Sequence, residues 1–430
     1  MDFYAHPEEK LPVLAEVDVL VAGGGPAGIG AALRAAQLGC RTMVIEMQDC
    51  LGGMATAGMM SHWGGMSSSR ILQEIYGRAA AMGPLYGGIP GNAGENAINH
   101  EVQKILFDTM MKEAGVEVLF YTIVCGAIIE EGTVQGVIVQ NKSGRSVIRA
   151  QRVIDATGDG DAAAACGVPF TKGREEDGKM QPCTLMFKVG GVDYERAVLP
   201  GSFETLVDTP KGELQALARK ILPAPAGHVL LYSQPEEGTI CCNMTNVTDV
   251  DGTNAVDVTR ALMVSRSQIG PIVQFLREYA PGYEHCWLMS AGSLMGIRET
   301  RHFKGEQTLE PADILSARVY ENWVVRRAFF NFDIHNLGGP GLDKNGVQQK
   351  WDQPESYTIP YGCLIPVGLE GLLLSGRNIS GGHLAHSNFR IMSVCLAIGE
   401  AAGTAAALSV VHGISLRDVD VREIQKIVGE

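Results

Sequence analysis

The sequence predicts an α/β fold: a Rossmann-like parallel sheet with a β-meander crossover, joined to a second domain that has a mixed or antiparallel sheet. Three observations predict it. Residues 17–46 contain an apolar run, a glycine-rich turn, a helix of small residues, a second apolar run and a terminal acid. Strand-like runs separated by turns follow at 127–155, and a last apolar run at 371–376 precedes a long helix of small residues. Strands that alternate with helices are typical of parallel sheets, whereas strands joined by tight turns form a meander.

The glycine-rich turn has the pattern G-x-G-x-x-G. Gly23 permits a tight turn out of the first strand, Gly25 lets a ligand approach bare backbone, and Gly28 lets the helix lie close to the sheet. A pyrophosphate at the helix N-terminus would meet free N–H groups and the positive end of the helix dipole. Glu46, at the end of the second strand, can accept hydrogen bonds from both hydroxyls of an adenosine ribose and would repel a 2′-phosphate. The pattern predicts a dinucleotide site; the alternative is a purely structural glycine turn.

The other elements are expected in a definite order. Glycine and proline are frequent at 47–97, which is expected to form a loop. Apolar spacing and turn residues then predict a helix at 98–114, a third parallel strand at 116–121, a hairpin at 127–139, a buried strand at 152–155 and a helix at 255–279.

Several segments resemble the FAD-dependent oxidoreductase family of the glutathione-reductase-like flavoprotein superfamily. They are GGGPAG at 23–28, the acid at 46, the glycine pair at 52–53, DATGDGD at 155–161 and the stretch at 371–407. The likeness extends to 243–255 and 296–306, so it covers nearly the whole chain. The resemblance implies FAD as the cofactor, with noncovalent binding expected, and an oxidoreductase activity. It does not specify a substrate.

The resemblance also implies which residues bind FAD. They are Gly23, Gly25, Pro26, Ala27, Gly28, Glu46, Met47, Gly52, Gly53, Met54, Val124, Ala156, Thr157, Gly158, Gly376, Arg377, Asn378, Met392 and Ser393. The N–H groups of Met392 and Ser393, at the start of the last long helix, would stabilise negative charge on the pyrimidine edge of reduced flavin. Many relatives have an acid after the glycine at 376; here Arg377 and Asn378 stand in its place, so the ribityl contacts are expected to differ.

This interpretation divides the chain into two domains. A discontinuous FAD-binding domain is expected at 1–165 and 359–430, and a substrate or cap domain at 166–358. The sequence contains no second G-x-G-x-x-G, so a separate NAD(P)H domain is not expected. A nicotinamide that donates electrons would have to enter the substrate cleft or act through a redox partner protein.

Candidate catalytic residues lie between the last strand and the last long helix, where the resemblance places the flavin. His383 and His386 could exchange a proton near neutral pH, and Arg390 could hold a substrate carboxylate through two parallel hydrogen bonds. Alternatively, the two histidines satisfy backbone groups of a loop. No metal site is expected from them, because no third ligand at suitable spacing is visible.

Further candidates lie elsewhere in the chain. In the charged segment 298–302, Arg298 or Arg301 would anchor a substrate over the flavin; alternatively, the segment forms an internal arginine–glutamate salt bridge between the domains. His335 could reach the cleft from a glycine-rich loop, and His62 or Tyr361 could contact flavin or substrate unless they are structural.

The expected reaction is hydride transfer between a small polar substrate, bearing a carboxylate or hydroxyls, and flavin N5. An NAD(P)H-dependent flavin monooxygenase is one alternative. A non-redox flavoprotein or assembly factor is the other. The residue Met54 follows the glycine pair where disulfide reductases of the superfamily carry a cysteine pair, which disfavours disulfide chemistry.

Net charge and cysteine usage indicate which kinds of partner and which cellular compartment to expect. The net charge is −13 without a basic block, which argues against nucleic acid and anionic membrane surfaces. The apolar stretch 394–411 carries Glu400 near its middle, which indicates a buried helix rather than a membrane span. No C-x-x-C and no secretory signal are present, so reduced thiols and a cytoplasmic location are expected. A homo-oligomer is compatible with these features.

Overall fold

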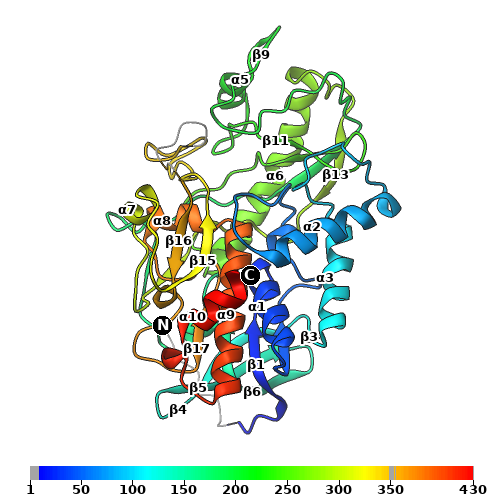
Figure 1. The fold of residues 1–430 in the computed structure, drawn as a ribbon. Helices are drawn as coiled ribbons and strands as arrows, with labels where there is room; N and C mark the ends of the chain where they lie inside the picture. The colour runs from blue at the N-terminus through cyan, green and yellow to red at the C-terminus, as the bar shows by residue number, and fades with distance from the viewer. Residues whose placement is uncertain (1–8, 348–352, 354, 430) are drawn as a thin grey trace.

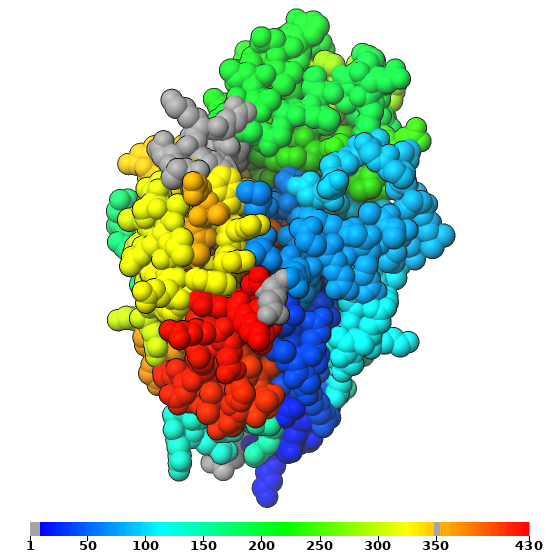
Figure 2. Space-filling view, in the orientation of Figure 1, coloured from blue at the N-terminus to red at the C-terminus, as the bar shows by residue number. Residues whose placement is uncertain are grey.

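The computed structural model describes residues 9–347, 353 and 355–429; the first eight residues, where no secretory signal was predicted, lie outside this part. The chain forms a mixed α/β protein, as the sequence predicts, with a large sheet at one end of the molecule and a smaller antiparallel sheet at the other (Figure 1). In Figure 2 residues around 200–260, coloured green, form one end of the surface, and the red C-terminal helices pack against the blue N-terminal segment.

The large sheet has seven strands in the order β3-β2-β1-β6-β5-β4, with β17 paired to β6. Its strands are β1 Val13–Ala22, β2 Thr42–Ile45, β3 Glu117–Leu119, β4 Ile123–Glu130, β5 Thr133–Asn141, β6 Gly144–Asp155 and β17 Leu372–Leu374. The strands β3, β2, β1, β6 and β17 run parallel, whereas β4, β5 and β6 form the antiparallel meander. The parallel strands bring their carboxyl ends to one edge of the sheet, which is where ligands bind in such folds.

The strand β6 belongs to both parts of this sheet. The sequence suggests a turn at 141–144, which the structure has between β5 and β6, and a separate buried strand at 152–155. The structure has instead one continuous strand from Gly144 to Asp155. The N-terminal half of β6 pairs with β5, and its last three residues pair with β17. The meander therefore continues the parallel sheet directly, without a break before Arg152.

Ten helices occur among the described residues. They are α1 Pro26–Gln37, α2 Arg70–Met82, α3 His100–Ala114, α4 Asp161–Ala165, α5 Leu214–Ile221, α6 Ala255–Tyr279, α7 Pro311–Leu315, α8 His383–Phe389, α9 Met392–His412 and α10 Val421–Gly429. The predicted helix at 255–279 is confirmed, and α3 matches the prediction to within two residues because Asn99 caps its first turn at 3.1 Å from Val102 N.

Two segments that were predicted as loops contain helices. The helix α2 lies inside the predicted loop 47–97; Ser69 caps it, and Ile71, Leu72 and Ile75 are buried on one face. The helix α8 lies inside the predicted loop between β17 and α9. Both predictions were wrong because glycine-rich flanks hid short helical patterns whose stability comes from tertiary packing.

The helices α1 and α9 lie side by side against the large sheet (Figure 1). They approach closely because α9 has glycine at 399 and 403: a Cβ there would lie 1.9 and 2.2 Å from backbone oxygens of α1. The helix α9 is long and apolar enough to cross a membrane by length and composition, but 89% of its most apolar stretch is buried in the protein. Glu400 of α9 is buried and pairs with Arg34 of α1 at 2.9 Å. This helix is therefore the centre of the main core.

A second core lies at the other end of the molecule. Its residues come from 183–295 and include one face of α6 and the antiparallel sheet β11-β12-β8-β13. These strands are β8 Phe187–Gly190, β11 Leu231–Ser233, β12 Ile240–Cys242 and β13 Trp287–Ala291. The remaining strands are β7 Phe170–Lys172, β9 Asp208–Thr209, β10 Gly212–Glu213, β14 Arg301–Phe303, β15 Trp323–Ala328 and β16 Tyr357–Pro360. Buried residues between Phe303 and Ile334 pack in the main core.

Candidate active site

A groove runs along the carboxyl ends of β1, β2, β6 and β17. Most of the predicted FAD-binding residues line it: Gly23, Gly25, Pro26, Ala27, Glu46, Met47, Gly53, Met54, Val124, Ala156, Thr157, Gly158, Gly376, Arg377 and Met392. Gly28, Gly52, Asn378 and Ser393 do not line the groove and support it from behind. The parallel topology therefore brings residues from 23 to 392 into one binding surface.

The glycine turn gives the groove a backbone floor. Gly23 has φ +98°, and a Cβ there would lie 2.4 Å from the oxygen of Ala156. At Gly25, by contrast, no protein atom lies within 4 Å of the Cβ position. Gly25 is also the N-cap of α1, and no side chain caps this helix. The first N–H groups of α1 are thus available to a pyrophosphate in a space that any side chain at 25 would fill.

Glu46 is held in place to receive a ribose. Its Oε2 accepts a hydrogen bond from Gly24 N at 2.7 Å, and its Oε1 accepts one from Gln48 N at 2.8 Å. The residue is 6% exposed, and burial raises the pKa of its carboxyl although the backbone N–H groups oppose this. Each oxygen keeps acceptor capacity for a ribose hydroxyl. These observations fit the adenosine half of FAD.

The positions that replace the usual ribityl-binding acid have different roles. Asn378 points away from the groove: it accepts from Ser375 N at 3.0 Å and donates to the oxygen of Asp155 at 3.0 Å, which joins β17 to β6. Arg377 lines the groove and pairs with Asp159 at 2.6 Å. Asp159 also lines the groove, so an acid from the neighbouring loop lies beside Arg377 there. The sequence analysis missed Asp159 as a site residue, although it stands in the DATGDGD segment.

A second cavity of about 330 Å³ adjoins the groove, and Met54, Ile297, Arg377, Arg390 and Met392 line both. The helix α9 begins between them, at Met392. The remaining lining comes from several distant segments: Met60, His62, Gly64, Thr184, Met186, Gly201, Ser202, Leu230, Tyr232, Asn243, Gly296, Arg298, Phe330, Asn331, Asp333, His335 and Ile391. This volume is at the small end of the range for ligand pockets.

Arg298 is the most unusual charge in this cavity. Its side chain is 9% exposed, and Nη1 donates to the carbonyl of Pro182 at 2.5 Å. Among the described residues Arg298 forms no ion pair, whereas Arg301 of the same segment pairs with Asp161 at 2.9 Å. Burial, followed by the charge of Arg390, lowers the pKa of Arg298 to about 10, which leaves it cationic at neutral pH.

Arg390, Asp333 and His335 form a connected group beside Arg298. The Arg390 guanidinium donates to both the carbonyl and Oδ2 of Asp333 at 2.9 Å, and His335 Nε2 lies 3.4 Å from Asp333 Oδ1. Burial, then Arg298, lowers the pKa of His335 to about 4, so the imidazole is neutral at pH 7. Burial acts to raise the Asp333 pKa, but His335 and the two arginines outweigh it, and the net pKa is lowered.

His62 and Tyr232 form the opposite part of the lining. Their rings lie 5.1 Å apart, and His62 Nδ1 is 2.8 Å from Ser61 Oγ. The oxygens of two lining amides, Asn243 Oδ1 and Asn331 Oδ1, are buried and have no hydrogen-bond partner among the residues that the structure describes. Tyr232 and the two asparagines were missed by sequence analysis, because nothing in their local sequence marks them.

His383 and His386, the predicted acid–base residues, line neither the groove nor the second cavity. Both lie in α8, and His383 Nδ1 contacts Glu299 at 2.7 Å. Tyr361 is also removed from both, because its hydroxyl donates to the carbonyl of Leu416 at 2.9 Å in the main core. Of the predicted catalytic residues the structure brings Arg298 and Arg390 together in the cavity, and the further candidate His335 lies there as well.

Comparison with known proteins identifies the family. A family model described as FAD dependent oxidoreductase matches residues 18–428. The chain belongs to this family. FAD is its cofactor, and it is an FAD-dependent oxidoreductase.

Individual relatives are more distant. The chain is 32% identical to a thiamine thiazole synthase of Methanococcus aeolicus over 44% of this chain and 73% of the relative. It is 30% identical to a digeranylgeranylglycerophospholipid reductase of Methanopyrus kandleri over 47% of this chain, spanning about half (53%) of that relative. A solved geranylgeranyl bacteriochlorophyll reductase-like protein of Thermoplasma acidophilum aligns with 96% of this chain and 82% of its own, at 15% identity and a TM-score of 0.47.

Proposed function

We propose that the second cavity binds a small polar substrate through a carboxylate, for hydride exchange with flavin N5, which is the chemistry that FAD supplies when bound. The observation that carries this proposal is Arg298. Among the described residues the Arg298 guanidinium has a carbonyl partner but no ion pair, because the nearby Asp333 carboxylate pairs with Arg390 instead. A substrate carboxylate would pair with Arg298 directly through two parallel hydrogen bonds. Burial in a small cavity makes such a contact strong and selective.

The neighbouring group would handle the proton that accompanies the hydride. Oxidation of a hydroxyl or amine carbon removes a hydride from C–H and a proton from O–H or N–H. His335 is neutral at pH 7 and can accept this proton, while Asp333 stabilises the resulting imidazolium and Arg390 holds Asp333. The reverse steps would serve a reduction.

The experiment is an anaerobic screen in which hydroxy acids, amino acids, sugars and NAD(P)H are each added to the oxidised protein. Bleaching of the flavin absorbance by a carboxylate, but not by its amide, supports the proposal. Bleaching only by compounds without a carboxylate would contradict it. If nothing but NAD(P)H reduces the flavin, oxygen consumption decides for the NAD(P)H-dependent monooxygenase.

We also propose a superfamily, an electron donor, a cellular location and a mode of FAD binding for this protein. The meander and the strand order support a place in the glutathione-reductase-like superfamily. One dinucleotide motif in the sequence favours a nicotinamide or redox partner that reaches the same cavity. Ten free cysteines and the buried α9 support a cytoplasmic location. FAD in the supernatant after acid precipitation would support noncovalent binding.

A further inference from the structure

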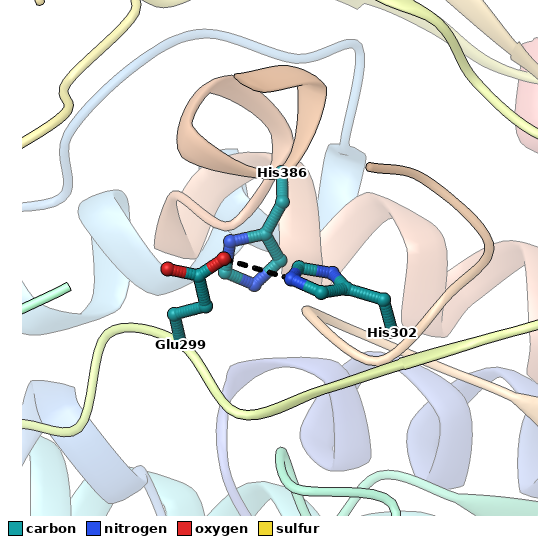
Figure 3. Close-up of side chains that lie close together, drawn as sticks. All are labelled: Glu299, His302 and His386. Carbon is teal, nitrogen blue, oxygen red and sulfur yellow. Dashed lines mark hydrogen bonds and ion pairs between the residues drawn. The ribbon is translucent and has the colours of Figure 1, made fainter. Parts of the chain in front are cut away.

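Four polar side chains gather beneath the active site, outside both cavities. Glu299 lies just before β14, His302 lies in β14, and His383 and His386 come from α8; Figure 3 draws Glu299, His302 and His386. Glu299, His302 and His386 are 1%, 6% and 1% exposed. One ligand-type atom from each of these three residues lies within 4.8 Å of the other two. Neither the groove nor the second cavity includes them.

Hydrogen bonding leaves part of this cluster unsatisfied. His302 Nε2 lies 2.8 Å from Glu299 Oε1, but its Nδ1 is buried without a partner. His386 Nδ1 is likewise buried without a partner, and no hydrogen bond is made by the imidazole of His386 within the described part of the chain. The His386 ring instead meets the His302 ring edge-on at 4.8 Å. Buried polar groups in native proteins nearly always have a partner, and a bound ion would supply one for His386.

We propose that Glu299, His302 and His386 bind a divalent transition-metal ion of the zinc class. Two imidazoles and one carboxylate are a donor set that zinc accepts. Donor atoms around tetrahedral zinc lie roughly 3.3 Å apart, so small rotations of these side chains would bring them to an ion. The ion would satisfy His386 and balance the buried carboxylate.

The surroundings of Glu299 support this assignment. Its Oε2 accepts from Gln181 N at 2.9 Å, and His383 Nδ1 lies 2.7 Å from its Oε1. Hydrogen bonds of this kind fix the orientation of metal-binding carboxylates. Three protein ligands leave one position for water or for His383. No metal site was expected from the sequence, because Glu299 and His302 lie far from His386 along the chain.

The site would position the substrate-binding arginine. Glu299 directly follows Arg298, and Thr300 donates to Asp159 of the FAD groove at 2.7 Å. A metal that joins this segment to α8 would hold Arg298 in position and would also hold the Thr300–Asp159 hydrogen bond in place. This role does not depend on what the substrate is, so the metal proposal stands or falls separately from the proposed function.

The test measures metal content and metal-dependent stability. Protein purified without chelators is analysed for metals, then stripped and titrated with Co²⁺ while its visible absorbance and Tm are followed. We expect about one ion per chain, Co²⁺ bands of a nitrogen and oxygen site, and a Tm that rises with the ion. His302→Gln and His386→Gln should lose these responses, and His383→Gln should weaken binding by roughly 10–100-fold.

His228→Gln is the matched control. His228 is as buried as the cluster, its Nε2 contacts Asn243 O at 3.1 Å, and it has no place in the cluster. This variant should bind Co²⁺ as the unchanged protein does. FAD retention reports whether each variant is folded. If the folded, unchanged protein takes up no Co²⁺ and its Tm does not respond, the cluster is a histidine–glutamate hydrogen-bond network and the proposal is wrong.

Discussion

The FAD groove and the second cavity adjoin each other but differ in the chemical groups that line them. The groove uses backbone: the glycine turn, the uncapped start of α1 and the loop after β6, with Glu46 as its single buried acid held by N–H groups. The cavity uses charged side chains, namely Arg298, Arg390, Asp333 and His335, brought together from separate segments. We therefore expect cofactor binding to depend on the space that glycine leaves, and binding of the proposed substrate to depend on the charge of Arg298.

The largest expected effect is on the groove. Gly25 has φ −69°, and no protein atom lies near its Cβ position, so Gly25→Val should fold normally yet fill the pyrophosphate site. We expect FAD affinity to fall by roughly 100-fold or more, since displaced phosphate contacts cost several kcal/mol. Bound FAD per chain is the measurement.

Gly382→Val is the matched control for that variant. Gly382 is also a helix N-cap with extended backbone and an open Cβ position, but it lines neither cavity. It should retain FAD. Equal loss of FAD from both variants would mean that the groove is not the cofactor site.

The next effect concerns the cavity alone. His335→Gln removes the proposed base and should lower the rate of flavin reduction by roughly 10²–10⁴-fold without loss of bound FAD. Because the pKa of His335 is lowered to about 4, the rate should show no inflection near the ordinary histidine pKa of about 6.5 and should fall only toward pH 4. Anaerobic reduction rates across pH provide the test. An inflection near pH 6.5 that disappears in the variant would contradict the lowered pKa of His335.

A third expected effect is on the free energy of unfolding, and it arises from the packing of α1 and α9 rather than from the groove or the cavity. Gly399→Ala would place a Cβ 1.9 Å from the oxygen of Ala27, so α9 must move away from α1. Overpacking of this kind costs about 1–3 kcal/mol or more, and the loss should appear in denaturant unfolding. In Gly77→Ala, an exposed position of α2 with open space, stability should rise by up to about 1 kcal/mol. No loss in Gly399→Ala would contradict the close packing of α1 and α9.

The last expected effect is on the stability of the folded protein at acid pH, and it concerns the buried residue His228. Burial lowers the pKa of His228 to about 3, whereas the unfolded chain binds a proton near the ordinary value of about 6.5. The stability that neutral His228 contributes is thus complete above about 6.5 and is lost as pH falls toward 3. In His228→Gln the drop in unfolding free energy between about pH 7 and pH 5 should shrink by roughly 2 kcal/mol. An unchanged drop would show that His228 is protonated in the folded protein.

The difference between the groove and the cavity also explains which features could be predicted from the sequence. The segment from β1 to Glu46 was predictable because turn, cap and acid are neighbours in the chain, and α6 and α9 because their patterns are long. The helices α2 and α8 were missed because packing, rather than local sequence, stabilises them. Tyr232, Asn243 and Asp333 meet only in the folded chain, so no spacing could have indicated the cavity they line.

The most direct test of the account is the anaerobic reduction of the flavin in the Arg298→Met protein, with Arg152→Met as the control. Arg152 is a partly buried arginine that binds Ser409 and lines neither cavity. For the carboxylate substrate found in the screen, Arg298→Met should lose roughly 30-fold or more in kcat/KM, while FAD content stays unchanged, because removing one partner of a buried charge pair costs about 2–5 kcal/mol. Unchanged reduction by the same carboxylate in Arg298→Met would contradict the assignment of Arg298 as the group that binds the substrate.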